Sequence, residues 1–67
     1  MKPSYDKFVE LMERKGVIPA DVARETNINQ SVFSDWKRGV SAPKIDKLMQ
    51  LVAYFGVTIE DLLTEEE

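Results

Sequence analysis

Apolar residues recur every three or four positions along most of this 67-residue chain, which is the spacing of amphipathic helices. Helix start and stop signals divide this pattern into five segments. We predict helices at residues 5–15, from Pro19 to the Thr26-Asn27 turn, at 30–38, at 44–55, and from Thr58 onward. No strand pattern of useful length is present. The fourth helix is expected to bury one face, formed by Ile45, Leu48, Met49, Val52 and Phe55.

Capping residues support the first and last of these helices. Ser4 is suited to accept a hydrogen bond at the start of the first helix, and Gly16 suits the left-handed conformation that ends it. Thr58 and Asp61 follow a capping-box pattern at the start of the fifth helix. The sequence therefore indicates both where these helices begin and where the first one stops.

A tight turn joins the second and third helices. Asn27 tolerates the left-handed conformation that a chain needs on leaving a helix, and Ile28 can then place an apolar side chain between the two helices. Asn29 is suited to cap the next helix. Phe33 and Trp36, three residues apart, mark the inward face of that helix. Two short helices joined in this way form a helix-turn-helix.

The aromatic residues follow the same apolar faces, with one exception. Tyr54 flanks the apolar stripe of the fourth helix, so we expect it to be exposed, at a surface suited to a partner. The other five aromatic residues are expected in the core, where base stacking is not their role: Tyr5, Phe8, Phe33, Trp36 and Phe55.

Composition excludes several classes of function. The chain has no cysteine and no histidine, so disulfides and the usual zinc sites are excluded. Its three glycines are spaced as helix stops rather than as a phosphate-binding loop, and its serines have no evident activating partner. We therefore expect no enzyme activity, no metal, no cofactor and no small-molecule ligand. The longest apolar run, residues 51–55, is too short to span a bilayer, so we expect a cytoplasmic protein without membrane contact.

Charge is distributed unevenly along the chain. The net charge is −3, but five of the 12 acidic residues lie in the last eight positions. Residues 1–59 carry seven acidic and nine basic side chains, and four of the basic ones follow closely on the third helix: Lys37, Arg38, Lys44 and Lys47. A local basic stripe of this kind can bind phosphate even when the whole chain is acidic. We expect residues 1–64 to form one domain and residues 65–67 an acidic tail.

Residues 29–39 read Asn-Gln-Ser-Val-Phe-Ser-Asp-Trp-Lys-Arg-Gly. This stretch resembles the DNA-binding motif of the phage repressor and Cro family, also called the XRE family, whose pattern is polar-Gln-Ser-x-apolar-Ser-x-apolar-x-x-Gly. Ala23, Pro43 and the Gly56-Val57 pair also match, so the resemblance covers about residues 5–63. It implies an all-α, five-helix, lambda-repressor-like domain with its helix-turn-helix at the second and third helices. It also implies sequence-specific binding to double-stranded DNA.

The resemblance assigns roles to the third helix and its surroundings. The base-reading positions are Gln30, Ser31, Val32 and Asp35, and the phosphate-binding positions are Asn29, Ser34, Lys37, Arg38 and Lys44, with the backbone near Gly39. Glutamine can bond adenine through two hydrogen bonds, and valine can lie against a thymine methyl group. Asp35 is open to three interpretations: it reads a cytosine, it orients Arg38, or it is an ordinary surface acid. The alternative for the whole set is that these residues form an ordinary solvated helix face with no role in DNA binding.

The start of the second helix departs from the family pattern. Many members have Ser or Thr near position 18 and Gln at position 19, where this chain has Ile18 and Pro19. Neither side chain can bind a phosphate as those residues do. The backbone amides of Ala20 and Asp21 are still placed to face one. The Asp21 carboxylate would oppose a phosphate there, so we expect modest affinity for DNA.

Three functions fit these observations. The leading one is a prokaryotic or phage transcriptional repressor that occupies an operator as a dimer. The fifth helix is then the expected dimer surface, through Val57, Ile59, Leu62 and Leu63. The first alternative is an antitoxin-like protein-interaction module of the same fold, which the acidic tail and Asp35 favour. The second is that the chain is the DNA-binding part of a longer regulator.

Overall fold

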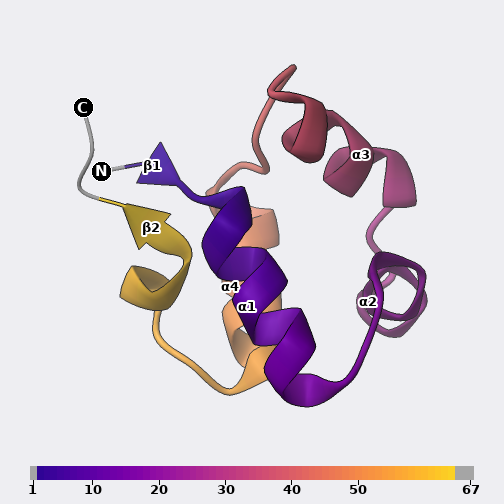
Figure 1. Ribbon diagram of the computed structural model, residues 1–67, viewed down its shortest axis with the longest axis vertical. Helices are drawn as coiled ribbons and strands as arrows, with labels where there is room; N and C mark the ends of the chain where they lie inside the picture. The colour runs from indigo at the N-terminus through magenta and orange to yellow at the C-terminus, as the bar shows by residue number, and fades with distance from the viewer. Residues whose placement is uncertain (1, 65–67) are drawn as a thin grey trace.

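The computed structural model describes residues 2–64 and arranges four α-helices around one apolar core (Figure 1). The elements are β1 (Lys2–Pro3), α1 (Tyr5–Lys15), α2 (Pro19–Thr26), α3 (Gln30–Arg38), α4 (Ile45–Phe55), η1 (Ile59–Leu62) and β2 (Leu63–Thr64). The 3-10 helix η1 packs against both α1 and α4, while α2 packs against α3 and α4. Strands β1 and β2 pair in antiparallel register, Lys2 with Thr64, which brings the two ends of the described chain together. The predicted acidic tail, residues 65–67, lies outside the described residues.

The predicted boundaries of α1 and α3 are confirmed by their caps. The Ser4 hydroxyl accepts a hydrogen bond from the Lys7 amide at 3.3 Å, which satisfies one of the free N–H groups at the start of α1. Gly39 ends α3 with a φ of 76°, a left-handed conformation that glycine adopts without steric cost. Both helices therefore begin and end where local side-chain chemistry places them.

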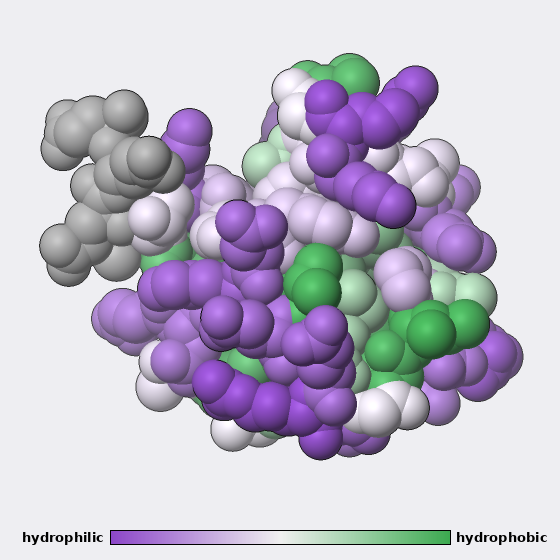
Figure 2. All heavy atoms as spheres, viewed as in Figure 1, coloured by the Kyte–Doolittle hydropathy of each residue, from purple (hydrophilic) through white to green (hydrophobic). Residues whose placement is uncertain are grey.

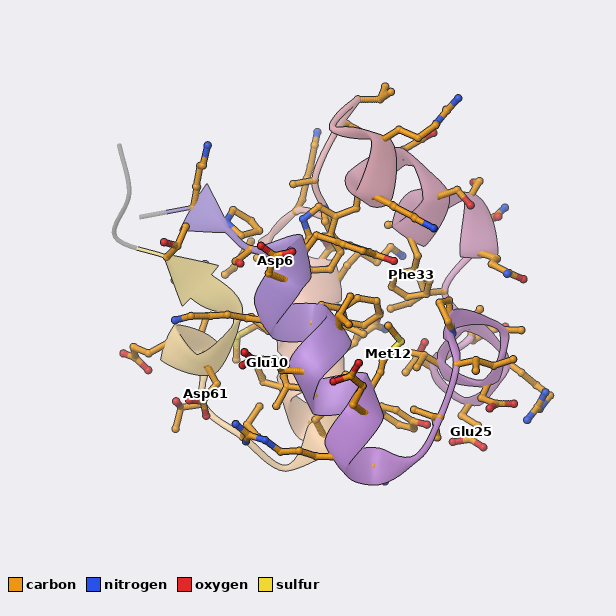
Figure 3. All side chains as sticks on the ribbon, viewed as in Figure 1. Asp6, Glu10, Met12, Glu25, Phe33 and Asp61 are labelled. Carbon is orange, nitrogen blue, oxygen red and sulfur yellow. The ribbon has the colours of Figure 1, made fainter. Side chains whose placement is uncertain are left out.

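Three stacked aromatic rings form the centre of the core. The Phe8 ring lies 5.0 Å from both the Phe33 and the Trp36 ring, with interplanar angles of 17° and 28°. Phe8 is fully buried and Trp36 is only 6% exposed. Figure 3 shows Phe33 and Met12 in the space between α1 and the α2–α3 pair. The prediction of core positions is confirmed for these three rings, while Tyr5 and Phe55 are half-buried at the core edge.

The buried face of α4 differs from the predicted one. Ile45 is 64% exposed and Met49 is 50% exposed, so neither belongs to the core. The residues that α4 buries are Leu48, Leu51 and Val52. Apolar residues cover much of the circumference of this helix, so the pattern of apolar positions does not define a unique inward stripe. Packing against η1 and α2 decides which stripe is buried.

The predicted fifth helix is also wrong in type. Its start is as expected, because the Thr58 amide donates to Asp61 Oδ2 at 3.1 Å. The helix is only one 3-10 turn, however, and the chain becomes extended at Leu63, with φ −110° and ψ 152°. The Ser4 amide donates to the Leu62 carbonyl at 2.8 Å, and Lys7 Nζ donates to the Leu63 carbonyl at 2.5 Å. These contacts hold the segment in β2, a strand too short to show as a sequence pattern.

The described helices are all short. None of those between residues 2 and 64 combines the length and the apolarity that crossing a bilayer requires.

Candidate nucleic-acid interface

The turn between α2 and α3 is built as the sequence predicted. Asn27 has a φ of 62°, and Ile28 is buried between the helices with only 2% of its surface exposed. Asn29 Oδ1 accepts a hydrogen bond from the Ser31 amide at 3.0 Å, which caps α3. The Thr26 hydroxyl donates to the Val22 carbonyl at 2.6 Å and closes the last turn of α2. The two helices are thus held in a fixed relative orientation.

Helix α3 has an apolar inner face and a polar outer face. Phe33 and Trp36 point into the core, and Val32 and Asp35 are partly buried at its edge. Figure 2 shows hydrophilic side chains projecting at the top of the molecule, where α3 lies in Figure 1. The exposed residues of α3 are Gln30, Ser31, Ser34, Lys37 and Arg38. A rigid helix with such a face has the form of a recognition helix.

Two surface hollows flank α3 and are lined by six of the nine predicted site residues; Asn29, Ser31 and Arg38 line neither. Gln30, Ser34 and Lys37 line one side, in a hollow of about 160 Å³ that Tyr5, Pro19 and Phe33 complete. Val32 and Asp35 line the other side, in a hollow of about 260 Å³ that also includes Lys44 and Lys47. Spacings of three, four and seven residues explain the first group, because these positions share one side of a helix. Tyr5 and Lys47 were not among the predicted site residues.

Asp35 and Arg38 form an ion pair on the outer surface of α3. Asp35 Oδ1 lies 2.7 Å from a terminal nitrogen of Arg38, one helical turn away. Both side chains are partly exposed, and an exposed pair of this kind contributes little to stability. The contact that orients Arg38 is therefore present, in line with one of the three interpretations of Asp35.

The backbone at the end of α3 is engaged within the molecule. The Gly39 amide donates to the Trp36 carbonyl at 3.1 Å, and the Val40 amide donates to the Asp35 carbonyl at 2.9 Å. Both N–H groups complete the left-handed end of the helix. These two amides are therefore not available to a phosphate, contrary to the expectation that the backbone near Gly39 contacts one.

The start of α2 is closed by the carboxylate of Asp21. Asp21 Oδ2 accepts a hydrogen bond from the Ile18 amide at 3.1 Å, and Oδ1 accepts one from Arg24 at 3.0 Å. These two contacts, the backbone one first, hold the pKa of Asp21 below its ordinary value. The Asp21 amide itself donates to the Ile18 carbonyl at 2.9 Å. A negative charge of the chain itself therefore occupies the helix end where an anion would be favoured.

Several basic side chains, Arg38 among them, are already engaged within the molecule, whereas three lysines in and after α3 are not. Arg24 pairs with Asp21 and Glu25, and Lys7 donates to backbone carbonyls. Between residues 2 and 64, no ion pair or hydrogen bond involves the ammonium groups of Lys37 in α3 or of Lys44 and Lys47 at the start of α4. Unpaired ammonium groups thus line both hollows, Lys37 the smaller one and Lys44 and Lys47 the larger one, which Asp35 and Asp46 line as well.

The predicted dimer residues lie in unequal environments. Leu62 is fully buried under α1 and α4, so it is a core residue and has no surface for a partner. Val57, Ile59 and Leu63 are half-buried and remain partly accessible. The difference arises because the 3-10 turn of η1 points Leu62 inward as the anchor of the last segment.

Tyr54 is half-buried rather than fully exposed. Its hydroxyl donates to Glu25 at 2.5 Å, and Lys15 Nζ lies 4.9 Å from the centre of its ring. Burial, and then the hydrogen bond to Glu25, raise the pKa of Tyr54 to about 12. The side chain that was expected to serve a partner instead links α1, α2 and α4.

The fold and the polar outer face of α3 define a helix-turn-helix domain, a class of domain that places one helix in a groove of nucleic acid. Residues 7–66 match the Cro/C1-type HTH DNA-binding domain, and the chain belongs to this family.

Two curated proteins are similar to most of this chain. It is 31% identical over 58 residues to the HTH-type transcriptional regulator DdrOP3 of Deinococcus deserti, covering 87% of this chain and 45% of that protein. It is 27% identical over 62 residues to the HTH-type transcriptional activator BcrR of Enterococcus faecalis, covering 92% of this chain and 30% of that protein. The chain thus spans less than half the length of either relative. No solved structure gives a significant match.

Proposed function

We propose that this chain binds double-stranded DNA in a sequence-specific manner, with α3 in the major groove, and represses transcription as a dimer on an operator. The outer face of α3 carries this proposal. Five exposed polar or charged side chains project from a helix whose inner face is fixed by Phe33 and Trp36. A rigid base for the reading residues limits the conformational entropy lost on binding.

The N-terminal part of α3 is the proposed reading element. Gln30 and Ser31 are exposed at its first turn, where recognition helices contact base edges. Gln30 is suited to adenine, which offers one acceptor and one donor in the major groove. Val32 lies on the opposite flank, beside the α3–α4 loop, and completes the base-facing set. Asp35 lines the same flank, where its carboxylate pairs with Arg38. Val32 offers an apolar contact to a thymine methyl group.

The proposed phosphate contacts surround this reading element. Ser34 and Lys37 lie on one flank of α3 and Lys44 on the other, while Arg38 is exposed near its C-terminal end. The oxygen of the Asn29 side chain is occupied by the Ser31 amide, so its NH₂ group is the part that donates to a phosphate. Such contacts fix the position of the protein on the duplex and make its affinity salt-dependent.

A dimer supplies the length of site that one short helix lacks. Two copies related by a twofold axis would read inverted half-sites about 34 Å apart, one turn of the double helix. Val57, Ile59 and Leu63 are the accessible members of the proposed dimer surface. Repression then needs no further surface, because an occupied operator blocks polymerase. The names of the two relatives include a regulator and an activator, so they support regulation in general.

A second candidate function is a protein-interaction module of the same fold. The closed N-terminus of α2 favours it, because Asp21 places a negative charge where many family members meet a phosphate. The net charge of −3 points the same way. Under this alternative the outer face of α3 would contact a protein rather than a duplex.

Fluorescence anisotropy with a labelled random duplex separates the two functions. The proposal predicts binding at low salt and a linear fall of log affinity with log salt concentration. The interaction-module alternative predicts no increase in the anisotropy of the duplex at any salt concentration. A triple variant, Lys37→Gln with Lys44→Gln and Lys47→Gln, should reduce the salt slope. Arg14→Gln, which removes an exposed base on α1, is the control and should leave the slope nearly unchanged.

A further inference from the structure

The hollow between α1 and α3 contains a polar group that the proposed function does not use. We propose that the Tyr5 hydroxyl binds a DNA phosphate, and that Tyr5, Ser34 and Lys37 together form one phosphate-binding site beside the reading helix. This inference rests on the proposed function and adds to it a contact from α1, an element outside the helix-turn-helix.

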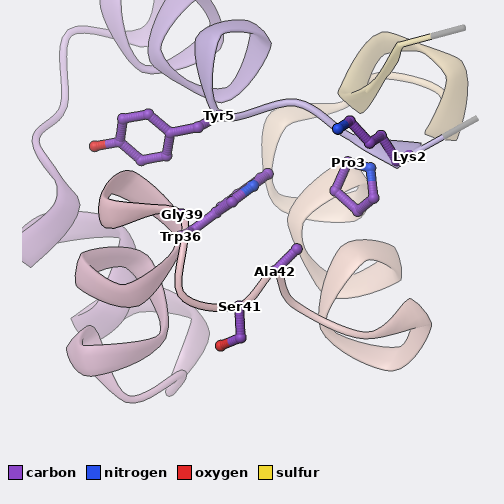
Figure 4. A pocket seen from close by; sticks show the side chains of 7 residues that line it. All are labelled: Lys2, Pro3, Tyr5, Trp36, Gly39, Ser41 and Ala42. Atoms are coloured by element: carbon purple, nitrogen blue, oxygen red, sulfur yellow. The ribbon is translucent and has the colours of Figure 1, made fainter. Parts of the chain in front are cut away.

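The Tyr5 ring is held firmly on the edge of the core. It meets the Trp36 ring edge-on at 5.6 Å and 77°, and it lies 5.7 Å from the Phe8 ring. Figure 4 shows Tyr5 beside Trp36 with its hydroxyl pointing away from Lys2 and Pro3. The base of the ring is thus packed while its polar end projects outward, an arrangement typical of tyrosines that are apolar at one end and hydrated at the other.

Tyr5 shares this hollow with donors from α3. Tyr5, Ser34 and Lys37 line the same hollow of about 160 Å³, with Phe33 and Pro19 as its apolar parts. One water molecule takes up only about 30 Å³ in the liquid, so the hollow has space for more than one small polar group. Within residues 2–64, no hydrogen bond engages the Tyr5 hydroxyl and no ion pair engages Lys37.

The chemistry of these donors selects a phosphate. A phenol hydroxyl, a serine hydroxyl and an ammonium group are all donors to phosphate oxygens in protein–DNA complexes. No carboxylate lines the hollow, so its potential is not opposed from within. Gln30, the proposed adenine reader, lines the same hollow. A phosphate held there would therefore fix the distance between the sugar–phosphate backbone and the base edge that Gln30 reads.

The test compares Tyr5→Phe with Tyr54→Phe, a second half-buried tyrosine whose hydroxyl bonds Glu25 on another part of the surface. Tyr5→Phe keeps the ring contacts and should melt as the wild type does, yet bind every duplex roughly ten-fold more weakly. Tyr54→Phe should bind as the wild type does. Equal affinities of Tyr5→Phe and wild type, with the wild type binding DNA normally, would overturn the Tyr5 assignment and leave the proposed function intact.

Neutral methylphosphonate linkages, introduced one at a time into the bound duplex, locate the contact. One position should weaken the wild type most. It should weaken Tyr5→Phe and Ser34→Ala less, because each of these variants has already lost one of the three contacts to that phosphate. If each linkage weakens the wild type and Tyr5→Phe equally, the hydroxyl binds no phosphate. If the wild type binds no duplex at all, the proposed function itself fails.

Discussion

The Asp35 carboxylate holds the Arg38 guanidinium, with 2.7 Å between Asp35 Oδ1 and a terminal nitrogen of Arg38. A helix contact of this type is worth only about 0.2–0.5 kcal/mol. Its effect on stability is therefore small, and its effect on the orientation of Arg38 is the larger consequence. Under the proposed function, an acidic residue that would otherwise fit poorly beside DNA would direct the Arg38 cation toward a phosphate.

We expect Asp35→Ala to leave the preferred DNA sequence unchanged and to alter affinity by about two-fold, since only the orientation of Arg38 is lost. Site selection with the variant and the wild type measures both quantities. Asp35→Asn should behave in the same way. If a cytosine preference disappears at one position in each half-site, Asp35 reads a base, and orientation of Arg38 is not its main role.

Arg38→Ala and Gln30→Ala should have different effects on DNA binding. Arg38→Ala removes a proposed phosphate contact, so affinity should fall for all sequences and the salt slope should become shallower by about one unit. Gln30→Ala should cost about 1–3 kcal/mol at the cognate site and relax the preference at one base pair. Titrations of cognate and random duplexes over a range of salt concentrations distinguish the two. Uniform losses with both variants would show that α3 is not the reading element.

Trp36→Ala should lower the free energy of unfolding by about 3–5 kcal/mol. The indole is 6% exposed and packs on both Phe8 and Tyr5, so its removal leaves a cavity at the centre of a small core. Urea denaturation followed by circular dichroism measures the loss, and thermal denaturation gives the change in melting temperature. A variant that melts within a degree or two of the wild type would mean that the indole contributes little to packing.

Asp21→Asn should strengthen DNA binding by about five-fold at low salt, because two unit charges 4 Å apart in water interact by about 1 kcal/mol. Asparagine can still accept the hydrogen bond from Ile18, so the start of α2 is preserved. Glu13→Gln, an exposed acid on α1, is the matched control and should have a smaller effect. Equal effects of the two variants would show that the position of Asp21 has no special influence on DNA.

The same variant has a predictable acid dependence. The folded-state pKa of Asp21 is lowered, so its contribution to stability is present above the ordinary value of 3.8 and is lost as pH falls through the folded pKa. The wild type should therefore lose more stability than Asp21→Asn on acidification below about pH 4. Parallel losses in the two proteins would mean that the negative charge of Asp21 contributes nothing measurable to stability.

The helix-turn-helix was predictable because short-range signals determine it. Asn27, Ile28 and Asn29 act as a turn, a wedge and a cap within three consecutive residues, and the structure confirms all three roles. Asp21 shows a signal that was overlooked: an acid three residues after an extended residue at a helix start is suited to cap it from within.

Features that depend on distant packing were not predictable. The exposure of Ile45 and Met49 depends on how η1 and α2 cover α4, and periodicity does not encode that choice. The strand at Leu63 exists because Lys2 pairs with Thr64, 62 positions along the chain. For Tyr5, helical spacing indicates only that the residue faces the core, and it does not show where the hydroxyl at the end of the ring lies.

Selection of binding sites from random double-stranded DNA tests the central claim most directly. The account predicts an enriched inverted repeat with half-site centres about 34 Å apart, bound by two chains at saturation. It also predicts that the Gln30→Ala variant loses preference at one base pair of each half-site. Recovery of no enriched sequence by the wild type or by Asp35→Ala, with duplex retention insensitive to salt, would contradict DNA reading by α3 and favour the protein-interaction module.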